Sequence, residues 1–237
     1  VEASLARLAG PKPLDGRHVL LTAGPTREPM DPVRYLSNHS SGKQGYAIAG
    51  ALADLGARVT LVSGPVSLAP PRGVDLVQVE TARQMMAACE AALPADVFVS
   101  VAAVADWRPA TRADRKLKLK EEGKGPPTLS LSENPDILAT ISRMTEGRPE
   151  LVIGFAAETD SVEENAALKR ERKGCDWIGA NDVSGDVMGG SDNEIALVTA
   201  TGIERWPRMG KLLVARQLAE RVADYFADSG KPRVAAE

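Results

Sequence analysis

Residues 20–49 read LLTAGPTREPMDPVRYLSNHSSGKQGYAIA, and this stretch predicts a strand, a long polar loop and then a helix. The apolar run at residues 19–23 stops at Gly24, and apolar residues return with helical spacing at Tyr46, Ile48 and Leu52. The loop between them is rich in proline, serine and glycine. Because strand, loop and helix in this order form the repeating unit of an open α/β sheet, the remaining chain is interpreted around this unit.

The end of that loop has the composition of a phosphate-binding loop. The first amides of a helix have no partner inside the helix and carry the positive end of its dipole. Gly42 and Gly45 would let phosphate oxygens approach such amides, and Ser40 or Ser41 could cap the helix or bind an oxygen. The alternative is an ordinary helix start in which the glycines serve tight packing.

Neither common nucleotide fingerprint is present. The dinucleotide pattern G-x-G-x-x-G should follow the strand at once, but Gly24 is followed by Pro25, and the strand expected at residues 58–63 ends without a ribose-binding acid. The Walker pattern also fails, because Gln44 follows Lys43 where serine or threonine is required. The sequence therefore indicates a phosphate or nucleotide site without naming its ligand.

Bulk composition is that of a soluble enzyme. The chain has 237 residues, 43% of them hydrophobic and 26% charged, which suffices for one large α/β domain. We expect a connector at residues 1–15, the domain at 16–228 and a tail at 229–237. A net charge of −3 indicates no nucleic-acid partner. No apolar run is long enough to cross a bilayer and the start lacks the order of a signal peptide, so we expect a cytoplasmic protein without a membrane partner.

Strand and helix patterns alternate along the chain. Apolar strands are expected at residues 58–63, 77–80, 96–101, 151–159 and 176–180, a helix capped by Thr81 at 82–93, a hairpin around Thr201 and Gly202, and a closing helix at 208–226. This order predicts an α/β fold with a doubly wound, mostly parallel, Rossmann-like sheet. The two cysteines, Cys89 and Cys175, lack metal-ligand spacing and are interpreted as buried apolar residues.

A second polar region follows the strand at residues 96–101. Small residues after that strand would leave room for a base or sugar, and Asp106 would lie at the rim of the crevice, unless it is simply a solvated turn acid. Residues 108–124 contain seven basic and three acidic side chains. Lys116, Lys118 and Lys120 alternate with leucines, so an extended chain would present all three on one face. Next to a phosphate site, this segment is interpreted as an anion-binding flap.

Several long blocks together carry a family resemblance. They are TAGPTREPMDPVRYLSNHSSGKQG, AAVADWRP, KLKLK, ENPDIL, VIGFAAET and ANDV. In these blocks the chain resembles the bacterial, CTP-dependent phosphopantothenoylcysteine synthetases, which form one half of a bifunctional coenzyme A biosynthesis protein. The resemblance covers the chain from about residue 15 onward. It implies a flavin-dependent decarboxylase fused upstream, and a homodimer formed through an extended arm that begins at Ser184 and ends at Ile203.

The resemblance implies a two-step ligation. The carboxylate of phosphopantothenate attacks the α-phosphorus of CTP, releasing pyrophosphate and leaving an acyl-cytidylate, whose acyl carbon is then attacked by the amine of cysteine with loss of CMP. Mg²⁺ is implied as the accompanying metal, with Asp106 as a candidate ligand. Two other hypotheses stay open on the sequence: a nicotinamide-dependent oxidoreductase on the same fold, and a non-catalytic nucleotide-binding module.

Site residues follow from matching positions in the family motifs. Asn38, Lys116 and Lys118 are expected in catalysis, with Lys120 an alternative to Lys118. Arg34, Asn38 and Asn181 are expected to contact phosphopantothenate or the acyl-cytidylate. The residues expected to contact the nucleotide are Gly24, Ser40, Gly42, Gly45, Ala102, Ala103, Asp106, Lys116, Pro135, Asp136, Ile137, Leu138, Phe155, Lys169 and Lys173, and the amides of the two alanines are expected to read the cytosine edge.

Overall fold

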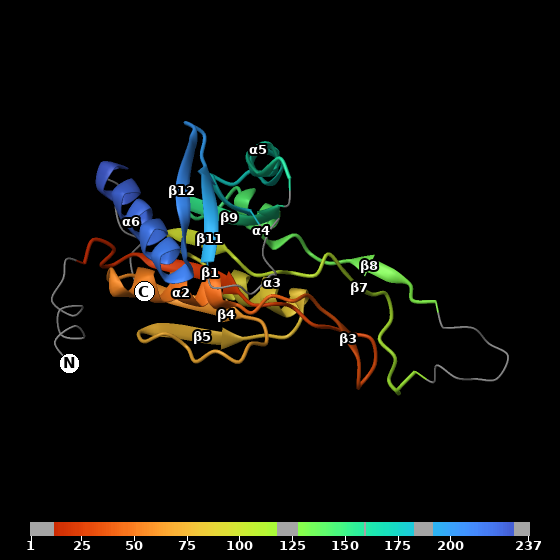
Figure 1. The fold of residues 1–237 in the computed structure, drawn as a ribbon. Coiled ribbons are helices and arrows are strands. Elements are labelled where there is room, and N and C mark those ends of the chain that lie inside the picture. The colour runs from red at the N-terminus through yellow and green to blue at the C-terminus, as the bar shows by residue number, and fades with distance from the viewer. Residues whose placement is uncertain (1–11, 118–127, 159, 183–191, 230–237) are drawn as a thin grey trace.

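An eight-stranded sheet forms the centre of the molecule, with the strand order β12-β11-β10-β9-β6-β1-β4-β5 (Figure 1). The computed structural model describes residues 12–117, 128–158, 160–182 and 192–229. The strands of this sheet are β1 (His18–Ala23), β4 (Arg58–Ser63), β5 (Val74–Gln78), β6 (Val97–Ser100), β9 (Leu151–Glu158), β10 (Trp177–Asp182), β11 (Asp192–Val198) and β12 (Ile203–Gly210). Strands β5, β4, β1, β6, β9 and β10 are mutually parallel, and β11 runs antiparallel to both β10 and β12.

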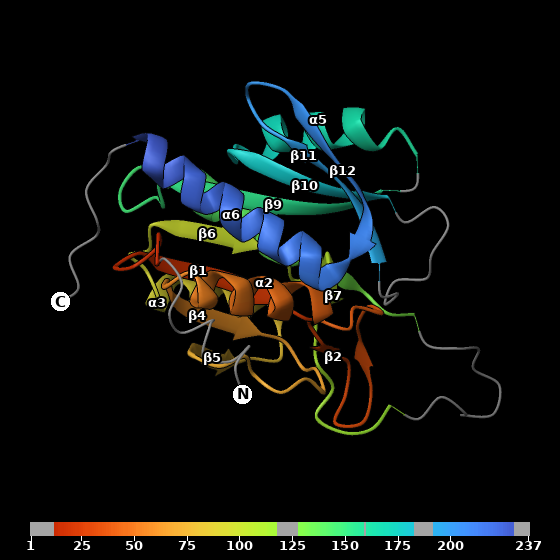
Figure 2. The same ribbon diagram turned by 60° about the vertical axis from the view of Figure 1, so that its left-hand side comes forward.

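Helices cover both faces of the sheet, as Figure 2 shows from a second side. The helices are α2 (Lys43–Asp54), α3 (Ala82–Ala91), α4 (Ile137–Ser142), α5 (Val162–Lys173) and α6 (Lys211–Ser229). The buried residues of α2 and α6 belong to one hydrophobic cluster, and those of α3, α4 and α5 belong to another. Strand β1 is buried along its whole length, which explains why its sequence is almost continuously apolar.

The predicted doubly wound, mostly parallel α/β fold is confirmed. Thr81 caps α3 as expected, since its side chain accepts a hydrogen bond from the Gln84 amide at 3.2 Å. The closing helix begins at Lys211 and not at residue 208, because β12 continues to Gly210 to complete its pairing with β11. Helix α4 begins after Asp136, whose carboxylate accepts from the Ala139 amide at 3.0 Å and so serves as the N-cap.

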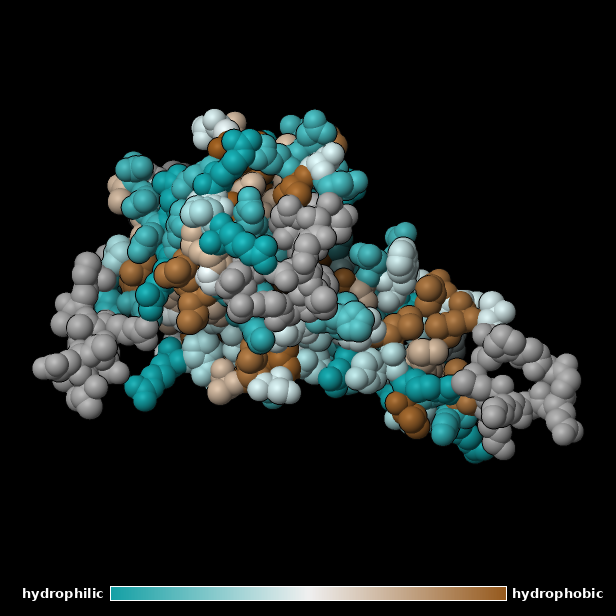
Figure 3. Space-filling model, in the orientation of Figure 1, coloured by the Kyte–Doolittle hydropathy of each residue, from teal (hydrophilic) through white to brown (hydrophobic). Residues whose placement is uncertain are grey.

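Two short antiparallel ribbons extend away from the sheet in both ribbon views (Figures 1 and 2). One pairs β2 (Glu28–Pro29) with β3 (Tyr35–Leu36), and the other pairs β7 (Trp107–Pro109) with β8 (Leu131–Glu133). Figure 3 shows hydrophobic residues gathered on this extension. Its exposed apolar side chains are Val33, Tyr35, Trp107 and Leu131.

Part of the segment expected to form a dimerisation arm lies in the central sheet. Residues 192–198 are strand β11, and the turn before β12 is closed by a hydrogen bond of 2.9 Å from the Thr199 amide to the Gly202 carbonyl oxygen. Residues 184–191 lie outside the described part of the chain. The arm therefore stays a prediction.

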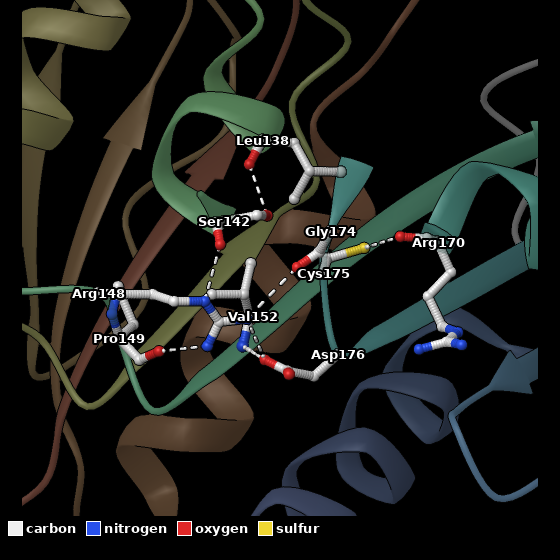
Figure 4. A network of polar contacts seen from close by, with 9 residues as sticks. All are labelled: Leu138, Ser142, Arg148, Pro149, Val152, Arg170, Gly174, Cys175 and Asp176. Carbon is white, nitrogen blue, oxygen red and sulfur yellow. Dashed lines mark hydrogen bonds and ion pairs between the residues drawn. The ribbon is translucent and has the colours of Figure 1, made fainter. Parts of the chain in front are cut away.

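A polar network fixes the amino ends of β9 and β10 against helix α4 (Figure 4). Arg148 donates to the Ser142 carbonyl oxygen at 2.8 Å and to the Asp176 carboxylate at 2.9 Å. The same carboxylate accepts from the Val152 amide at 2.8 Å. The network joins α4 to two strands, which holds the helix in place beneath the cavity described below.

Within residues 12–117, 128–158, 160–182 and 192–229, no helix combines sufficient length with sufficient apolar character to cross a bilayer.

Candidate nucleotide-binding site

The direction of winding changes between β1 and β6. From β1 the chain continues to β4 and β5 on one side, and then crosses to β6, which pairs with β1 on the other side. The connections after β1 and β6 therefore lead in opposite directions across the sheet, toward β4 and β9, and open α/β sheets bind ligands in the crevice formed at such a point. A parallel bridge between Pro25 and Ala103 continues the pairing just beyond the two strand ends.

The start of helix α2 lies at this crevice. Gly42 is the N-cap residue and has φ of 75°, and Gly24 at the end of β1 has φ of 76°, so both occupy the left-handed region that glycine tolerates. No side chain in the described part of the chain caps α2. Capping by Ser40 or Ser41 was a wrong expectation: the Ser40 hydroxyl accepts a long bond of 3.4 Å from the Gly42 amide, ahead of the helix. An uncapped helix start that faces a crevice suits an anion.

Gly45 serves packing. A methyl group at this position would lie 2.5 Å from the Cβ atom of Ala23, so the missing side chain lets α2 lie directly on β1. Gly45 is buried. The packing interpretation therefore accounts for this glycine. Gly24 and Gly42 are closely packed as well, because a Cβ atom there would lie 3.0 Å and 2.8 Å, respectively, from the Val66 side chain. They differ from Gly45 in their positive φ angles.

Asn38 connects the two loops of the crevice. Its side-chain Nδ2 donates to the Ala103 carbonyl oxygen at 2.5 Å, and its Oδ1 accepts from the Ser40 amide at 3.0 Å. The Ala103 amide in turn donates to the Gly24 carbonyl oxygen at 2.9 Å. Because that amide is already bonded within the protein, reading of a base edge by Ala103 would require this bond to open.

A cavity of about 370 Å³ opens beside these loops. Its walls come from the segment after β6, the start of β7, the end of β8, helix α4, strand β9 and helix α5. The lining residues that were expected to contact a nucleotide are Ala102, Asp106, Pro135, Asp136, Ile137, Leu138, Phe155, Lys169 and Lys173. The structure thus brings together residues separated by up to 71 positions in the chain, from Ala102 to Lys173. Gly24, Ser40, Gly42, Gly45, Ala103 and Lys116 do not line it.

Two lysines of α5 supply the positive charge of this cavity. Lys169 donates from Nζ to the Phe155 carbonyl oxygen at 3.0 Å, and Lys173 forms an ion pair with Asp136. Burial opposes ionisation of Asp136, but the hydrogen bond and charge of Lys173 outweigh it, so the pKa of this carboxyl lies below its ordinary value. The carboxylate is thus ionised at neutral pH, and its N-cap bond to α4 persists.

The expected catalytic lysines lie only partly within the described chain. Lys116 is exposed at the end of one described stretch, whereas Lys118 and Lys120 lie outside the described residues. Arg34 is not freely mobile, because it donates to the Asp31 carboxylate from Nε at 2.9 Å and to the Leu117 carbonyl oxygen from Nη2 at 2.9 Å. Arg34 and the chain next to Lys116 are therefore held together.

Asn181 is half-buried near the carboxyl end of β10. Its Oδ1 atom is buried and has no hydrogen-bond partner among the described residues. An unsatisfied buried oxygen costs free energy, so a donor from a ligand or from the undescribed residues nearby would be favourable. This agrees with the expected contact between Asn181 and substrate without testing it.

The described residues contain no group of three or more histidine, cysteine or acidic side chains that could hold a metal ion. Asp106, the expected Mg²⁺ ligand, is exposed at the cavity. Mg²⁺ commonly keeps water and phosphate oxygens as ligands and needs few from the protein, so this donor set fits a metal that arrives with a triphosphate. Burial raises the pKa of Cys89 to about 12 and that of Cys175 to about 11, so neither is a thiolate nucleophile at neutral pH.

Sequence reasoning missed the residues that hold the crevice in shape. Buried Thr26 accepts from the Ala105 amide at 3.0 Å, and Asn134 donates to the Ala105 carbonyl oxygen at 2.8 Å. Both lie inside the quoted motif blocks. Their roles depend on contacts across more than 25 positions of the chain, which no local pattern displays.

A doubly wound sheet with an uncapped helix start at its switch point, and a cavity beside the neighbouring segment after β6, defines the class of α/β proteins that bind nucleotides or similar anions at this edge. Residues 14–226 match the family described as the DNA/pantothenate metabolism flavoprotein C-terminal domain. The chain belongs to that family.

Named relatives agree with this assignment. The chain is 49% identical to the coenzyme A biosynthesis bifunctional protein CoaBC of Vibrio vulnificus over 90% of its own length and 53% of that protein. It is 43% identical to CoaBC of Escherichia coli K12, with 98% and 57% covered. The chain thus spans about half the length of these relatives.

Solved structures agree as well. The crystal structure of the C-terminal domain of a CoaBC protein aligns with a TM-score of 0.77 at 39% identity, covering 92% of this chain and 99% of that one. A Cab2 variant in complex with phosphopantothenate-cysteine has a TM-score of 0.72 at 16% identity, with 98% and 91% covered, and at that identity the likeness concerns the fold alone.

Proposed function

We propose that the chain is a phosphopantothenate–cysteine ligase of coenzyme A biosynthesis that activates its acid substrate with CTP and Mg²⁺. One observation supports the proposal: nine of the fifteen residues that the family resemblance assigns to the nucleotide line one cavity, although they come from separate segments. The sequence identity of 49% to a CoaBC protein supports the proposed ligase activity.

In the first step the phosphopantothenate carboxylate attacks the α-phosphorus of CTP. The helix start of α2, with Gly24 and Gly42, is proposed to receive phosphate oxygens, and Lys169 and Lys173 to offset their charge from α5. Bound Mg²⁺ would neutralise charge on the leaving pyrophosphate. Because charge builds up on oxygens in this step, fixed cations and amides stabilise its transition state more than a covalent group would.

In the second step the cysteine amine attacks the acyl carbon of the acyl-cytidylate and CMP leaves. Asn38 is proposed to orient this intermediate, since it already joins the loop after β1 to the loop after β6. Arg34 is proposed to bind the substrate phosphate and Asn181 to contact the pantothenate portion. Lys116, with Lys118 or Lys120, would approach the nucleotide from the flap.

The assembly and location are proposals of the same kind. The protein is proposed to work in the cytoplasm as a homodimer, with a flavin-dependent decarboxylase domain on the same polypeptide, as the length and name of the CoaBC relatives suggest. The exposed apolar side chains of the β2–β3 and β7–β8 ribbons offer a contact surface besides the expected arm. Against a nicotinamide oxidoreductase, the chain has no ribose-binding acid directly after β4. Against a passive binding module, such a role would not explain why two lysines, Lys169 and Lys173, line the cavity.

The decisive experiment measures pyrophosphate release with phosphopantothenate and Mg²⁺, with CTP or ATP, and with or without cysteine. We expect CTP-selective release and formation of the amide only when cysteine is present. No turnover with either nucleotide, from a folded protein, would reject the ligase assignment for this chain. Tight binding of NADPH would instead revive the oxidoreductase.

Replacing Lys116 with glutamine tests the flap. We expect kcat to fall by about 10-fold to 100-fold with a smaller change in CTP affinity, because a flap lysine that stabilises the leaving pyrophosphate acts mainly in the transition state. Arg115→Gln is the matched control, since it removes the neighbouring exposed cation from the same segment. Equal losses in the two variants would mean that only the general positive charge of the segment matters.

A further inference from the structure

Asp31 is a buried carboxylate that the proposed mechanism does not use. Its relative exposure is 2%, although it lies in the polar loop between β2 and β3. Its two oxygens have separate tasks. Oδ1 accepts from the backbone amides of Val33 and Arg34, each at 2.8 Å, and this closes a turn within the loop.

The second oxygen, Oδ2, joins two distant segments. It accepts from Arg34 Nε at 2.9 Å and from Arg34 Nη2 at 2.5 Å, and also from the Leu117 amide at 3.1 Å. The same Nη2 group donates to the Leu117 carbonyl oxygen at 2.9 Å. One carboxylate oxygen and one guanidinium group thus engage both backbone polar groups of the residue that follows Lys116.

Charge keeps this arrangement intact. The hydrogen bond from Arg34 is the main cause that holds the pKa of the Asp31 carboxyl well below its usual range, and the backbone amides add to it. A lowered pKa means that the ionised form contributes stability above the ordinary carboxyl range, and that this contribution is lost only when pH falls through the lowered value. We call the contacts of Asp31 with Arg34 and Leu117 the clamp. The clamp is therefore complete at any pH at which the protein would be assayed.

A further backbone bond supports the same contact. The Ala113 amide donates to the Met30 carbonyl oxygen at 2.9 Å, so the segment before Lys116 is also attached to the loop that contains Asp31. The backbone on both sides of Lys116 is therefore already fixed, so binding a ligand there costs less backbone entropy, which is the advantage of preorganisation.

We propose that Asp31 is a positioning residue that fixes Arg34 and the Lys116–Leu117 backbone as one preassembled site for the phosphate group of the acid substrate. The inference rests on the proposed function and adds to it: the two cations act as a unit because one buried carboxylate sets their relative position. Asp31 itself touches no substrate.

Asp31→Asn tests this inference with unusual selectivity. The asparagine oxygen can still accept from the Val33 and Arg34 amides, so the turn is retained. Its Nδ2 group then faces Arg34 and the Leu117 amide, which are all donors, so the clamp is lost. We expect kcat/KM for phosphopantothenate to fall at least tenfold more than kcat/KM for pantothenate, which lacks the phosphate, chiefly through KM.

Asp96→Asn is the matched control. Asp96 is equally buried, accepts from Arg17 at 2.9 Å and from the His18 amide at 2.7 Å, and lies at the opposite, amino edge of the sheet. We expect it to lower thermal stability at least as much as Asp31→Asn without changing the preference for the phosphorylated substrate. A purely structural role of Asp31 would make the two variants alike.

A readout that needs no turnover completes the design. Amide hydrogen exchange at Leu117 should be faster in Asp31→Asn than in the parent protein and unchanged in Asp96→Asn. If the parent protein ligates but Asp31→Asn keeps its substrate preference, or if Leu117 exchange does not change, the inference is overturned. If the parent protein shows no ligation, the proposed function fails separately, and the exchange measurement still tests the clamp.

Discussion

Gly64→Ala is expected to cause the largest loss of stability among glycine-to-alanine changes in the described part of the chain. A Cβ atom at this position would lie 1.7 Å from the Pro25 carbonyl oxygen, far inside contact distance, and that oxygen belongs to the backbone. The loop after β1 must move to make room. Overpacking costs about 1–3 kcal/mol and sometimes more. Because the contact here is to backbone at 1.7 Å, we expect the upper end of that range, an unfolding free energy lower by about 3 kcal/mol in urea titration.

The loss should extend to the site, because the displaced loop carries Thr26. The Thr26 amide donates to the Ala103 carbonyl oxygen at 3.2 Å, and its hydroxyl accepts from the Ala105 amide. Nucleotide affinity should therefore fall together with stability. Gly50→Ala is the control within α2, since its methyl group would meet only the Pro71 side chain, at 3.3 Å, and alanine favours a helix. Identical unfolding curves for Gly64→Ala and the parent protein would contradict this packing.

Asn38→Asp is expected to stop the reaction after its first step. The aspartate can still accept from the Ser40 amide, but its second oxygen would face the Ala103 carbonyl oxygen in place of a donated hydrogen bond. We expect pyrophosphate release in a single burst, accumulation of acyl-cytidylate, and amide formation slower by about 10²–10³-fold, a loss of the size found when one oxyanion-hole donor is removed. Rapid quenching followed by mass spectrometry measures the intermediate directly.

Asn165→Asp is a suitable control for this substitution. Asn165 also donates from Nδ2 to a backbone carbonyl oxygen, that of Asp160, at 3.0 Å, but near the start of α5. This variant should form the amide at the rate of the parent protein. Normal amide formation in Asn38→Asp, with no acyl-cytidylate detected, would remove Asn38 from the second step.

Local pattern was sufficient for most elements of the fold. The apolar runs of β1, β4, β6 and β9 predict strands buried on both faces, and Thr81 predicts the start of α3. The boundaries that were wrong depend on pairing elsewhere: β12 continues to Gly210 only because it follows β11, and no property of residues 208–210 alone shows this.

The sequence was sufficient to predict many of the residues that line the candidate site, but not the hydrogen bonds and ion pairs between them. Family motifs pointed to residues that line the cavity, such as Phe155 and Lys173. They did not reveal that Lys173 pairs with Asp136, or that Arg34 is bonded to Asp31 and to Leu117. The pairs Lys173–Asp136 and Arg34–Leu117 join residues 37 and 83 positions apart, so they arise from the fold and leave no periodic trace in the sequence.

The chain enters the sheet at the edge opposite the cavity. Lys12 donates to the Asp54 carbonyl oxygen at 2.9 Å and the Leu14 amide to that of Leu55 at 3.1 Å, both at the end of α2, before β1 begins at His18. The parallel strands then run away from this edge and deliver their ligand-facing loops at the far side. A biosensor surface or fluorescent label attached ahead of Lys12 would therefore leave the cavity open to solution, so binding could be followed on an immobilised molecule.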